Sequence, residues 1–229
     1  MSSLHNAQQV VSKKRVADHG EVYTSKREVN AMLDLVKNET ERIESRFLEP
    51  ACGTGNFLAE ILARKLRVVE SRYVKNQIEF ERYAILAISS LYGIDILEDN
   101  VNECRRRLFG DFDWIYSQRF KKTAKNKCRN SAQYILERNI VHGDALTLKT
   151  VGDKPKPIVF SEWSPFKGSM FKRRDYIFSD LIPHEETEQS DLFSKSELYS
   201  DLGKRAVLPD EIRSYPLIHF LKLADVEQQ

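Results

Sequence analysis

Long hydrophobic runs are missing from this sequence of 229 residues. No apolar stretch approaches the roughly 20 residues needed to cross a bilayer, and the polar N-terminus lacks the apolar core of a secretion signal. We therefore expect neither membrane insertion nor secretion.

Cysteine is scarce. Cys52, Cys104 and Cys128 are an odd number, lie far apart, and form no C-x-x-C pair or cluster with histidine. This pattern indicates neither a disulfide framework nor a zinc site, so we expect a cytoplasmic protein without a metal centre.

An excess of charge of one sign is absent as well, because the formal net charge is only +2. A total this small does not by itself indicate a nucleic-acid partner, so that argument rests on local clusters. Residues 105–129 hold nine basic side chains against two acidic ones. The nine are Arg105, Arg106, Arg107, Arg119, Lys121, Lys122, Lys125, Lys127 and Arg129. The interleaved aromatic residues are Phe112, Trp114, Tyr116 and Phe120. They either stack on bases or anchor the segment, and a solvated face is the alternative for the basic run.

The hydrophobic content of 41% predicts one main globular unit. We expect a flexible arm over residues 1–19, the main domain over 20–180 with a basic insertion near 111–130, and an acidic extension over 181–229. Residues 180–191 hold five acids and no Lys or Arg, which favours a solvated loop or a protein partner over contact with DNA.

Apolar spacing predicts alternating helices and strands. Helices are expected over residues 26–43, after Phe57, over 75–90, from the cap Asp99 to the stop at Gly110, and around Ala132. Strands are expected at 46–49, 91–96, 139–146 and 158–160. Ser25 and Glu28 form a capping box for the first helix. This order predicts an α/β fold with a mostly parallel, doubly wound sheet and right-handed crossovers.

Three predicted strands end in an acid: Glu49, Asp95 and Asp144. The carboxyl ends of parallel strands meet at one edge of a sheet, so these acids become neighbours around one ligand. Gly53 and Gly55 follow the first strand and let backbone approach that ligand closely. The three carboxylates are hydrogen-bond acceptors and suit a ligand that carries an ammonium group, vicinal hydroxyls and an exocyclic amine.

Two other nucleotide sites fit less well. The fingerprint G-x-G-x-x-G begins at Gly53, but Leu58 replaces its third glycine. Asp95 lies 40 residues beyond Gly55 rather than the about 20 of a dinucleotide site. A P-loop needs a lysine after its second glycine, and none is present.

Residues 47–58, Phe-Leu-Glu-Pro-Ala-Cys-Gly-Thr-Gly-Asn-Phe-Leu, resemble motif I of the DNA adenine-N6 methyltransferases, especially type I modification subunits and related type II enzymes. Residues 20–24 resemble motif X of that family, 92–96 resemble motif II, and 142–146 resemble motif III. The resemblance implies a Rossmann-like fold that binds S-adenosylmethionine, with helices on both faces of the sheet.

The resemblance also implies roles for single residues. Glu49 would sit near the methionine ammonium, Asp95 would accept from the ribose hydroxyls, and Asp144 would accept from the adenine amino group. Gly53 and Gly55 would line the cofactor. The other implied cofactor-binding residues are Tyr23, Thr24, Pro50, Ala51, Asn56, Ile96 and Ala145.

The catalytic motif of the family is a polar acceptor, two prolines and an aromatic residue after the fourth strand. Ser164, Pro165 and Phe166 are the nearest match, with Trp163 where the acceptor would stand. Ser161 or Glu162 would then have to replace that acceptor. The alternative is a strand exit with apolar Trp163 and Phe166 in the core. A basic cluster follows this segment, where the resemblance implies that the DNA backbone would pass. Its residues are Lys167, Lys172, Arg173 and Arg174.

The 63 residues from Lys167 to Gln229 are fewer than the family uses for its remaining strands and its target-recognition region. We expect DNA recognition to lie in a separate subunit. The sequence predicts an S-adenosylmethionine-dependent DNA methyltransferase acting on adenine N6 in a restriction-modification system. An inactive cofactor-binding or partner-binding protein of such a system is the main alternative, and methylation of RNA or protein nitrogen is a third.

Overall fold

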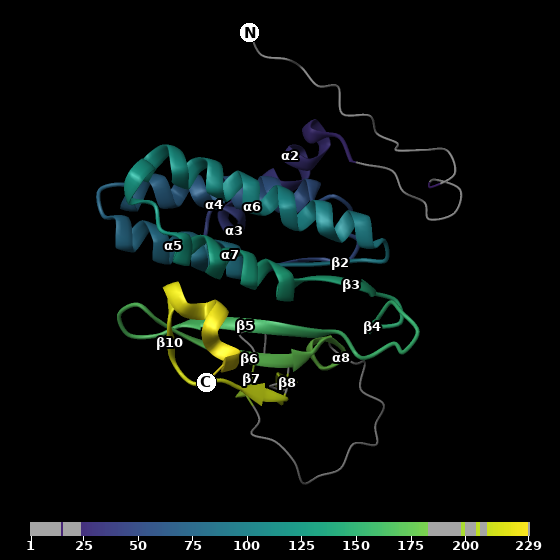
Figure 1. The fold of residues 1–229 in the computed structure, drawn as a ribbon. Helices are drawn as coiled ribbons and strands as arrows, with labels where there is room; N and C mark the ends of the chain where they lie inside the picture. Colours follow the sequence, from purple (N-terminus) through teal and green to yellow (C-terminus); the bar gives the residue numbers. More distant parts are fainter. Residues whose placement is uncertain (1–14, 16–23, 183–197, 200–204, 207–209, 229) are drawn as a thin grey trace.

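A computed structural model describes Arg15 and residues 24–182, 198–199, 205–206 and 210–228 (Figure 1). Apart from Arg15, the predicted arm over residues 1–19 therefore lies outside the described residues, as do Tyr23 and most of the acidic segment 180–191.

A short parallel sheet lies at the centre of the fold. Strands β1 (Phe47–Glu49), β2 (Leu91–Asp95) and β3 (Ile140–Asp144) pair in parallel in that order. The register places Phe47 opposite Leu91 and Gly93 opposite Ile140. Strand β4 (Lys149–Thr150) adds an antiparallel edge to β3. The mixed α/β class and three of the predicted parallel strands are confirmed.

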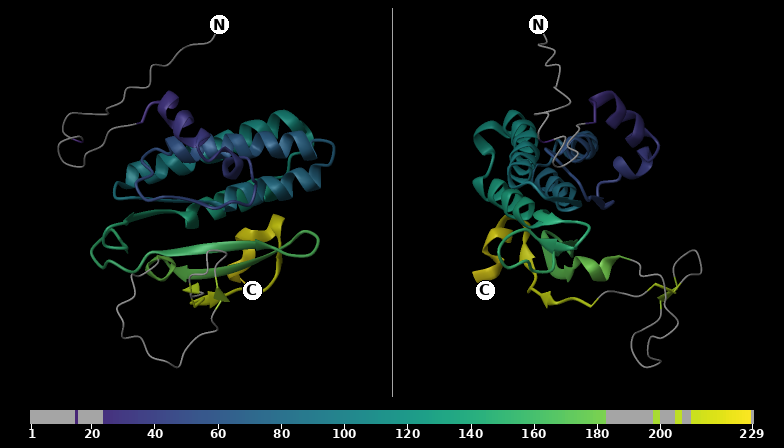
Figure 2. Two further views of the ribbon diagram at one scale, coloured as in Figure 1. Left: turned by 180° about the vertical axis from the view of Figure 1, so that it is seen from behind. Right: turned by 90° about the vertical axis from the view of Figure 1, so that its right-hand side faces the viewer.

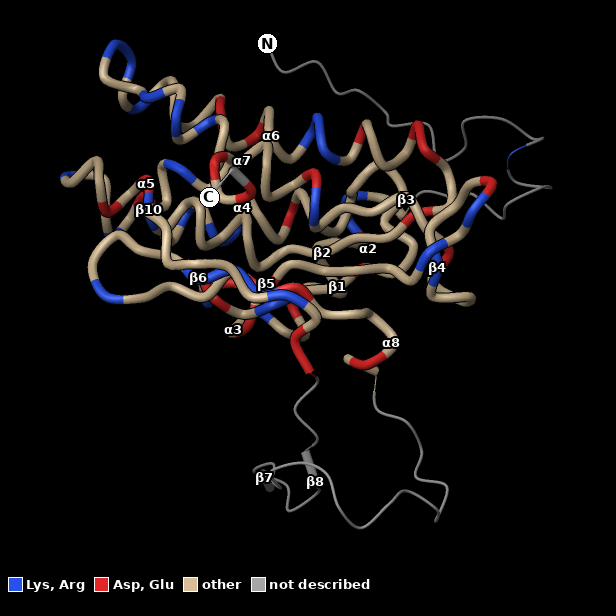
Figure 3. The backbone as a smooth tube through the Cα atoms, turned by 60° about the horizontal axis from the view of Figure 1, so that its bottom comes forward, with Lys and Arg blue, Asp and Glu red and all other residues tan. Residues whose placement is uncertain are grey.

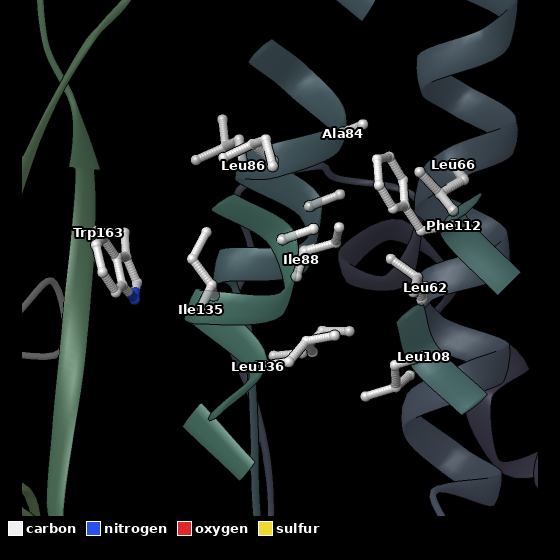
Figure 4. Close-up of a cluster of buried hydrophobic side chains, with 14 of the residues drawn as sticks. Leu62, Leu66, Ala84, Leu86, Ile88, Leu108, Phe112, Ile135, Leu136 and Trp163 are labelled. Carbon is white, nitrogen blue, oxygen red and sulfur yellow. The ribbon is translucent and has the colours of Figure 1, made fainter. Parts of the chain in front are cut away.

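Four long helices supply most of the core. They are α4 (Asn56–Tyr73), α5 (Gln77–Ser89), α6 (Glu98–Phe120) and α7 (Asn126–Asn139). Helices α4 and α6 lie side by side above α5 and α7 (Figures 1 and 2). Figure 4 shows Leu62, Leu108 and Phe112 facing Ile88 and Leu136 across this layer, and all five are buried. Burial of such side chains is the main stabilising term of the fold.

The predicted helix over residues 26–43 is divided in two. Helix α2 covers Lys26–Asp34 and begins with the predicted capping box of Ser25 and Glu28. Helix α3 covers Lys37–Thr40, because Val36 has non-helical dihedrals (φ −120°, ψ 34°). Beyond this break Thr40 and Ile43 are buried against α4, where Lys65 Nζ donates to the carbonyl of Ile43 at 3.1 Å.

The prediction of a helix stop at Gly110 and a separate insertion at 111–130 was wrong. Helix α6 continues to Phe120 because Leu108, Phe112 and Tyr116, spaced by four residues, are all fully buried on one face. A Cβ added at Gly110 would meet nothing within 4 Å, so this glycine lies on an open side of a continuous helix. The predicted cap Asp99 is also inside the helix, with Leu97 at the cap position.

Most of the basic residues between 105 and 129 bind groups of the protein itself. Arg105 donates to the carbonyl of Ile140 at 2.6 Å, and Lys125 donates to buried Glu81 at 2.8 Å. The other pairs are Arg106 with Glu103, Arg107 with Asn56, Arg119 with Glu70, and Arg129 with Asp113. Figure 3 shows basic and acidic positions interspersed along α6. These contacts favour the structural interpretation of the run over contact with nucleic acid.

The fourth predicted strand belongs to a different sheet, so its assignment to the parallel sheet was wrong. Strand β5 (Val159–Pro165) pairs antiparallel with β6 (Met170–Ile177), and β9 (Arg213–Ser214) and β10 (Ile218–His219) pair with β6. This sheet lies below the helices in Figure 1. Trp163 explains the placement, because its indole is buried against Tyr134 of α7 and donates to Asn139 at 3.3 Å.

The remaining elements complete the lower layer. Helix α8 (Phe178–Leu181) follows β6, and Phe178 packs with Tyr92 and Phe160 under the parallel sheet. The 3-10 segment η2 (Phe220–Gln228) packs on α7 and buries Leu223 and Val226. A further 3-10 turn, η1 (Lys121–Thr123), joins α6 to α7, and β7 (Leu198–Tyr199) pairs with β8 (Arg205–Ala206). No helix within the described ranges is both long and apolar enough to span a membrane.

A pair of aromatic truncations tests the extended α6. Phe112→Ala removes a fully buried ring, so the free energy of unfolding should fall by about 3–5 kcal/mol in urea titrations. Trp114→Ala, two residues along, removes a ring that is 68% exposed and should change it by less than about 0.5 kcal/mol. Equal effects of the two substitutions would contradict the placement of this helix.

Candidate functional site

A cavity of about 600 Å³ opens at the carboxyl ends of β1, β2 and β3. Ten of the twelve predicted cofactor-binding residues line it: Thr24, Glu49, Pro50, Ala51, Gly53, Asn56, Asp95, Ile96, Asp144 and Ala145. Gly55 is buried beneath it, and Tyr23 lies outside the described residues. The three strand-end acids therefore share one pocket, as the parallel topology requires.

The turn after β1 depends on its two glycines. Gly53 has φ +50° and Gly55 has φ +84°, a region that disfavours residues with a side chain. A Cβ added at Gly55 would lie 2.7 Å from Sγ of Cys104 on α6. The amide of Cys52 donates to the carbonyl of Ile94 at 2.9 Å, which ties the turn to β2. The turn thus needs glycine at position 55 for both conformation and space.

Asp95 joins the turn to the first residues of α6. Its Oδ2 accepts from the amide of Gly53 at 2.8 Å, and its Oδ1 accepts from the amide of Leu97 at 2.9 Å. The side-chain amide of Asn100 donates to Oδ1 at 3.3 Å. Asp95 as a whole is only 9% exposed, so these donors replace the water that its carboxylate loses on burial.

The other two acids differ in their environment. Burial raises the pKa of Glu49, against the smaller effect of the Ala51 backbone hydrogen bond, which lowers it. The backbone N–H of Leu146 holds the pKa of Asp144 below its ordinary value, and Leu146 N donates to Asp144 Oδ1 at 2.9 Å. Thr147 Oγ1 donates to Oδ2 of the same carboxylate at 3.0 Å. These hydrogen bonds favour the charged form of Asp144, which lines the pocket.

Asn56 holds the segment before α2 against the turn. Its Nδ2 donates to the carbonyl of Thr24 at 3.2 Å, while its Oδ1 accepts from Arg107 at 2.6 Å. The N-terminal side of the pocket is thus fastened to α6 through one amide side chain.

Sequence reasoning missed several lining residues. They are Cys52, Thr54, Phe57, Leu97, Asn100, Gly143 and Leu146. Most are neighbours in sequence of a predicted residue, which was a usable signal. Asn100 was less evident, because its amide reaches Asp95 from inside helix α6. Leu146 is 95% exposed at the rim, so its apolar side chain is open to a ligand or partner.

The structure does not bring Ser164, Pro165 and Phe166 to this pocket. Ser164 and Pro165 lie within β5 opposite Lys172 and Phe171, and Phe166 is exposed in the turn to β6. That turn is at the left in Figure 1, whereas β3 and β4 meet at the right. The residues that end β3 and follow it line the pocket. The expected strand exit is therefore continuous strand as far as Pro165, and only Phe166 lies in a turn. Arg173, expected to face DNA, is buried in an ion pair with Asp175 at 2.8 Å.

Comparison with known proteins identifies a related family over the part of the chain that forms the pocket. The family model of the MmeI DNA-methyltransferase domain matches residues 23–152, more than half of the chain and the whole of the pocket. DNA methyltransferase A of Bacillus subtilis (strain 168) is 26% identical over 164 residues. That match takes in 69% of this chain and 17% of the relative's length. No solved structure matches.

Residues 23–152, which include the pocket, thus match a DNA methyltransferase domain. The chain belongs to the family of the MmeI DNA-methyltransferase domain.

A matched pair of glycine substitutions tests the turn. Gly55→Ala should lower the free energy of unfolding by about 2 kcal/mol or more, because it adds left-handed strain to a clash with Cys104. Gly110→Ala, at an open helical position, should raise it by about 0.5–1 kcal/mol. Urea titration of both variants measures the difference, and a neutral Gly55→Ala would contradict the described turn.

The raised pKa of Glu49 predicts a pH-dependent stability. For an acid whose pKa is raised on folding, the charged form is penalised, so the penalty is complete above the folded pKa and vanishes below the unfolded pKa. Glu49→Gln should therefore increase the free energy of unfolding near neutral pH, and the increase should shrink as the pH falls toward about 4. Glu137→Gln, at an exposed position, is the control. An equal increase in the free energy of unfolding in both variants would contradict a raised pKa at Glu49.

Proposed function

We propose that this chain binds S-adenosylmethionine and transfers its methyl group to adenine N6 of DNA, as part of a restriction-modification system. The observation that supports it best is the convergence of Glu49, Asp95 and Asp144 with a glycine turn on one pocket. Membership of a DNA methyltransferase family supports the reaction class.

The carboxylate acceptors of the pocket fit the proposed cofactor. A volume of about 600 Å³ lies within the range that holds ligands of this size. Glu49 supplies a carboxylate for an ammonium group, Asp95 for ribose hydroxyls, and Asp144 for the exocyclic amine of adenine. When bound, S-adenosylmethionine supplies a methyl group on a positively charged sulfur.

Each acid gains something from its ligand in this proposal. Burial disfavours the charge of Glu49, and an ammonium group placed beside it would remove that penalty. Asp95 has about four acceptor positions, of which Gly53, Leu97 and Asn100 use three, so one ligand hydroxyl completes the set. Asp144 retains acceptor positions beyond those used by Leu146 and Thr147.

The acceptor half of the reaction places its own demands on the chain. The lone pair of adenine N6 is delocalised into the ring, so the base has to leave the duplex and meet acceptors that stabilise the developing charge. Because this proposal assigns Asp144 to the cofactor, and Ser164, Pro165 and Phe166 lie outside the pocket, these acceptors have to come from another segment or from a partner subunit.

An inactive cofactor-binding protein is the second candidate. It is favoured by one observation, that Ser164, Pro165 and Phe166 lie in the β5–β6 hairpin rather than beside the pocket. This candidate keeps the roles of Glu49, Asp95 and Asp144 and omits the transfer step.

Titration calorimetry with S-adenosylmethionine tests the binding step. Asp95→Asn keeps the shape of the side chain but removes its charge, so the affinity should fall by about tenfold to a hundredfold. Asp113→Asn makes the same change on α6 outside the pocket and should bind like the wild type. Absence of binding by the wild-type chain would refute the proposal.

Transfer of a radiolabelled methyl group to DNA, RNA and protein in parallel then separates the candidates. The proposal expects label in DNA, recovered as N6-methyladenine and lost in Asp95→Asn. Binding without transfer to any acceptor would support the inactive candidate, and label in RNA or protein would redefine the substrate.

A further inference from the structure

Arg15 lies far from the pocket in sequence but contacts its wall. Its guanidinium Nη1 is 2.5 Å from Oδ2 of Asp99, and Nη2 donates to Oδ1 of Asn100 at 3.2 Å. Both partners belong to the first turn of α6, 84 and 85 residues further along the chain. The hydrogen bond from Arg15 lowers the pKa of Asp99, so Arg15 and Asp99 form a charged pair at neutral pH.

Asn100 connects this contact to the pocket. Its side chain is buried and lines the cavity, and its Nδ2 donates to Oδ1 of Asp95 at 3.3 Å. An asparagine amide has one accepting and one donating end. Because Arg15 can only donate, it takes the accepting end and leaves the NH₂ group facing Asp95. The reversed amide would place its oxygen against the carboxylate and its NH₂ group against the guanidinium.

We propose that Arg15 is a positioning residue for the cofactor site, which acts through Asn100 to set the carboxylate of Asp95. This inference rests on the proposed binding of S-adenosylmethionine. With Asn100 fixed, Gly53, Leu97 and Asn100 hold both oxygens of Asp95, and the remaining acceptor position lies on Oδ2. Arg15 thereby fixes the direction from which a ribose hydroxyl is accepted.

Arginine suits this task better than lysine. Its planar guanidinium reaches the carboxylate of Asp99 and the amide of Asn100 at the same time. A lysine ammonium would keep the charge but not the fixed fork of donors. Lysine therefore keeps the positive charge of Arg15 but orients the amide of Asn100 less well. Arg15→Lys should for this reason have a smaller effect than Arg15→Ala.

The experiment measures the affinity of the full chain for S-adenosylmethionine by calorimetry. Arg15→Ala should weaken it about tenfold, within the range of couplings between contacting groups, and Arg15→Lys should recover part of the loss. Arg106→Ala is the matched control, because Arg106 pairs with Glu103 on the same helix and lies outside the pocket. It should bind like the wild type, and thermal melts confirm that each variant is folded.

Two further readouts distinguish positioning from a general loss of structure. Competition experiments compare adenosine with 2′,3′-dideoxyadenosine, which lacks the ribose hydroxyls. If Arg15 positions Asp95, Arg15→Ala should reduce the preference for adenosine. A general loosening of the fold would instead lower the affinity for both ligands equally. In an Asp95→Ala background, Arg15→Ala should cause no additional loss, because the group it positions is gone.

The outcomes separate this inference from the proposed function. A wild-type chain that fails to bind S-adenosylmethionine overturns both. A wild type that binds, with Arg15→Ala binding equally well, overturns the role of Arg15 alone. The role of Arg15 is also overturned if Arg15→Ala lowers the affinity for adenosine and for its dideoxy analogue equally. The same holds if Arg15→Ala still lowers the affinity for S-adenosylmethionine in the Asp95→Ala background.

Discussion

The carboxylate of Asp95 holds the candidate site together. It accepts from the amide of Gly53 in the glycine turn and from the amide of Leu97 at the start of α6, so one buried side chain connects β1, β2 and α6. A buried carboxylate without donors would be costly, and here the backbone supplies them. The same contacts fix the geometry of the glycine turn, which forms part of the pocket wall. Structural stability and the proposed recognition of the cofactor therefore depend on the same atoms.

The pocket holds a charge that its surroundings disfavour. Burial raises the pKa of Glu49, so the charged form of this side chain is penalised where it lines the pocket. Such features concentrate at functional sites, because a sequence optimised for stability alone would avoid them. In the antiparallel sheet, by contrast, the buried charge of Arg173 is paired with Asp175 and contacts Tyr134. This contrast agrees with placing function at the carboxyl ends of the parallel strands.

Local patterns were enough to predict the pocket from the sequence. Glu49, Asp95 and Asp144 each end an apolar strand, and parallel pairing brings such ends together whatever the details of packing. The antiparallel β5–β6 hairpin was not predictable in this way, because its position depends on long-range burial of Trp163 against Tyr134. The prediction of a helix stop at Gly110 was wrong for a related reason, because burial of one face of α6 keeps the helix continuous past this glycine. Arg15 gave no local signal at all, because its partners lie 84 and 85 residues away.

A crystal structure of the chain with S-adenosylhomocysteine would test the central claim most directly. The account predicts that the ligand lies between Glu49, Asp95 and Asp144, with a ribose hydroxyl within hydrogen-bonding distance of Oδ2 of Asp95. A ligand bound elsewhere on the protein, or a pocket that stays empty at saturating concentration, would contradict it.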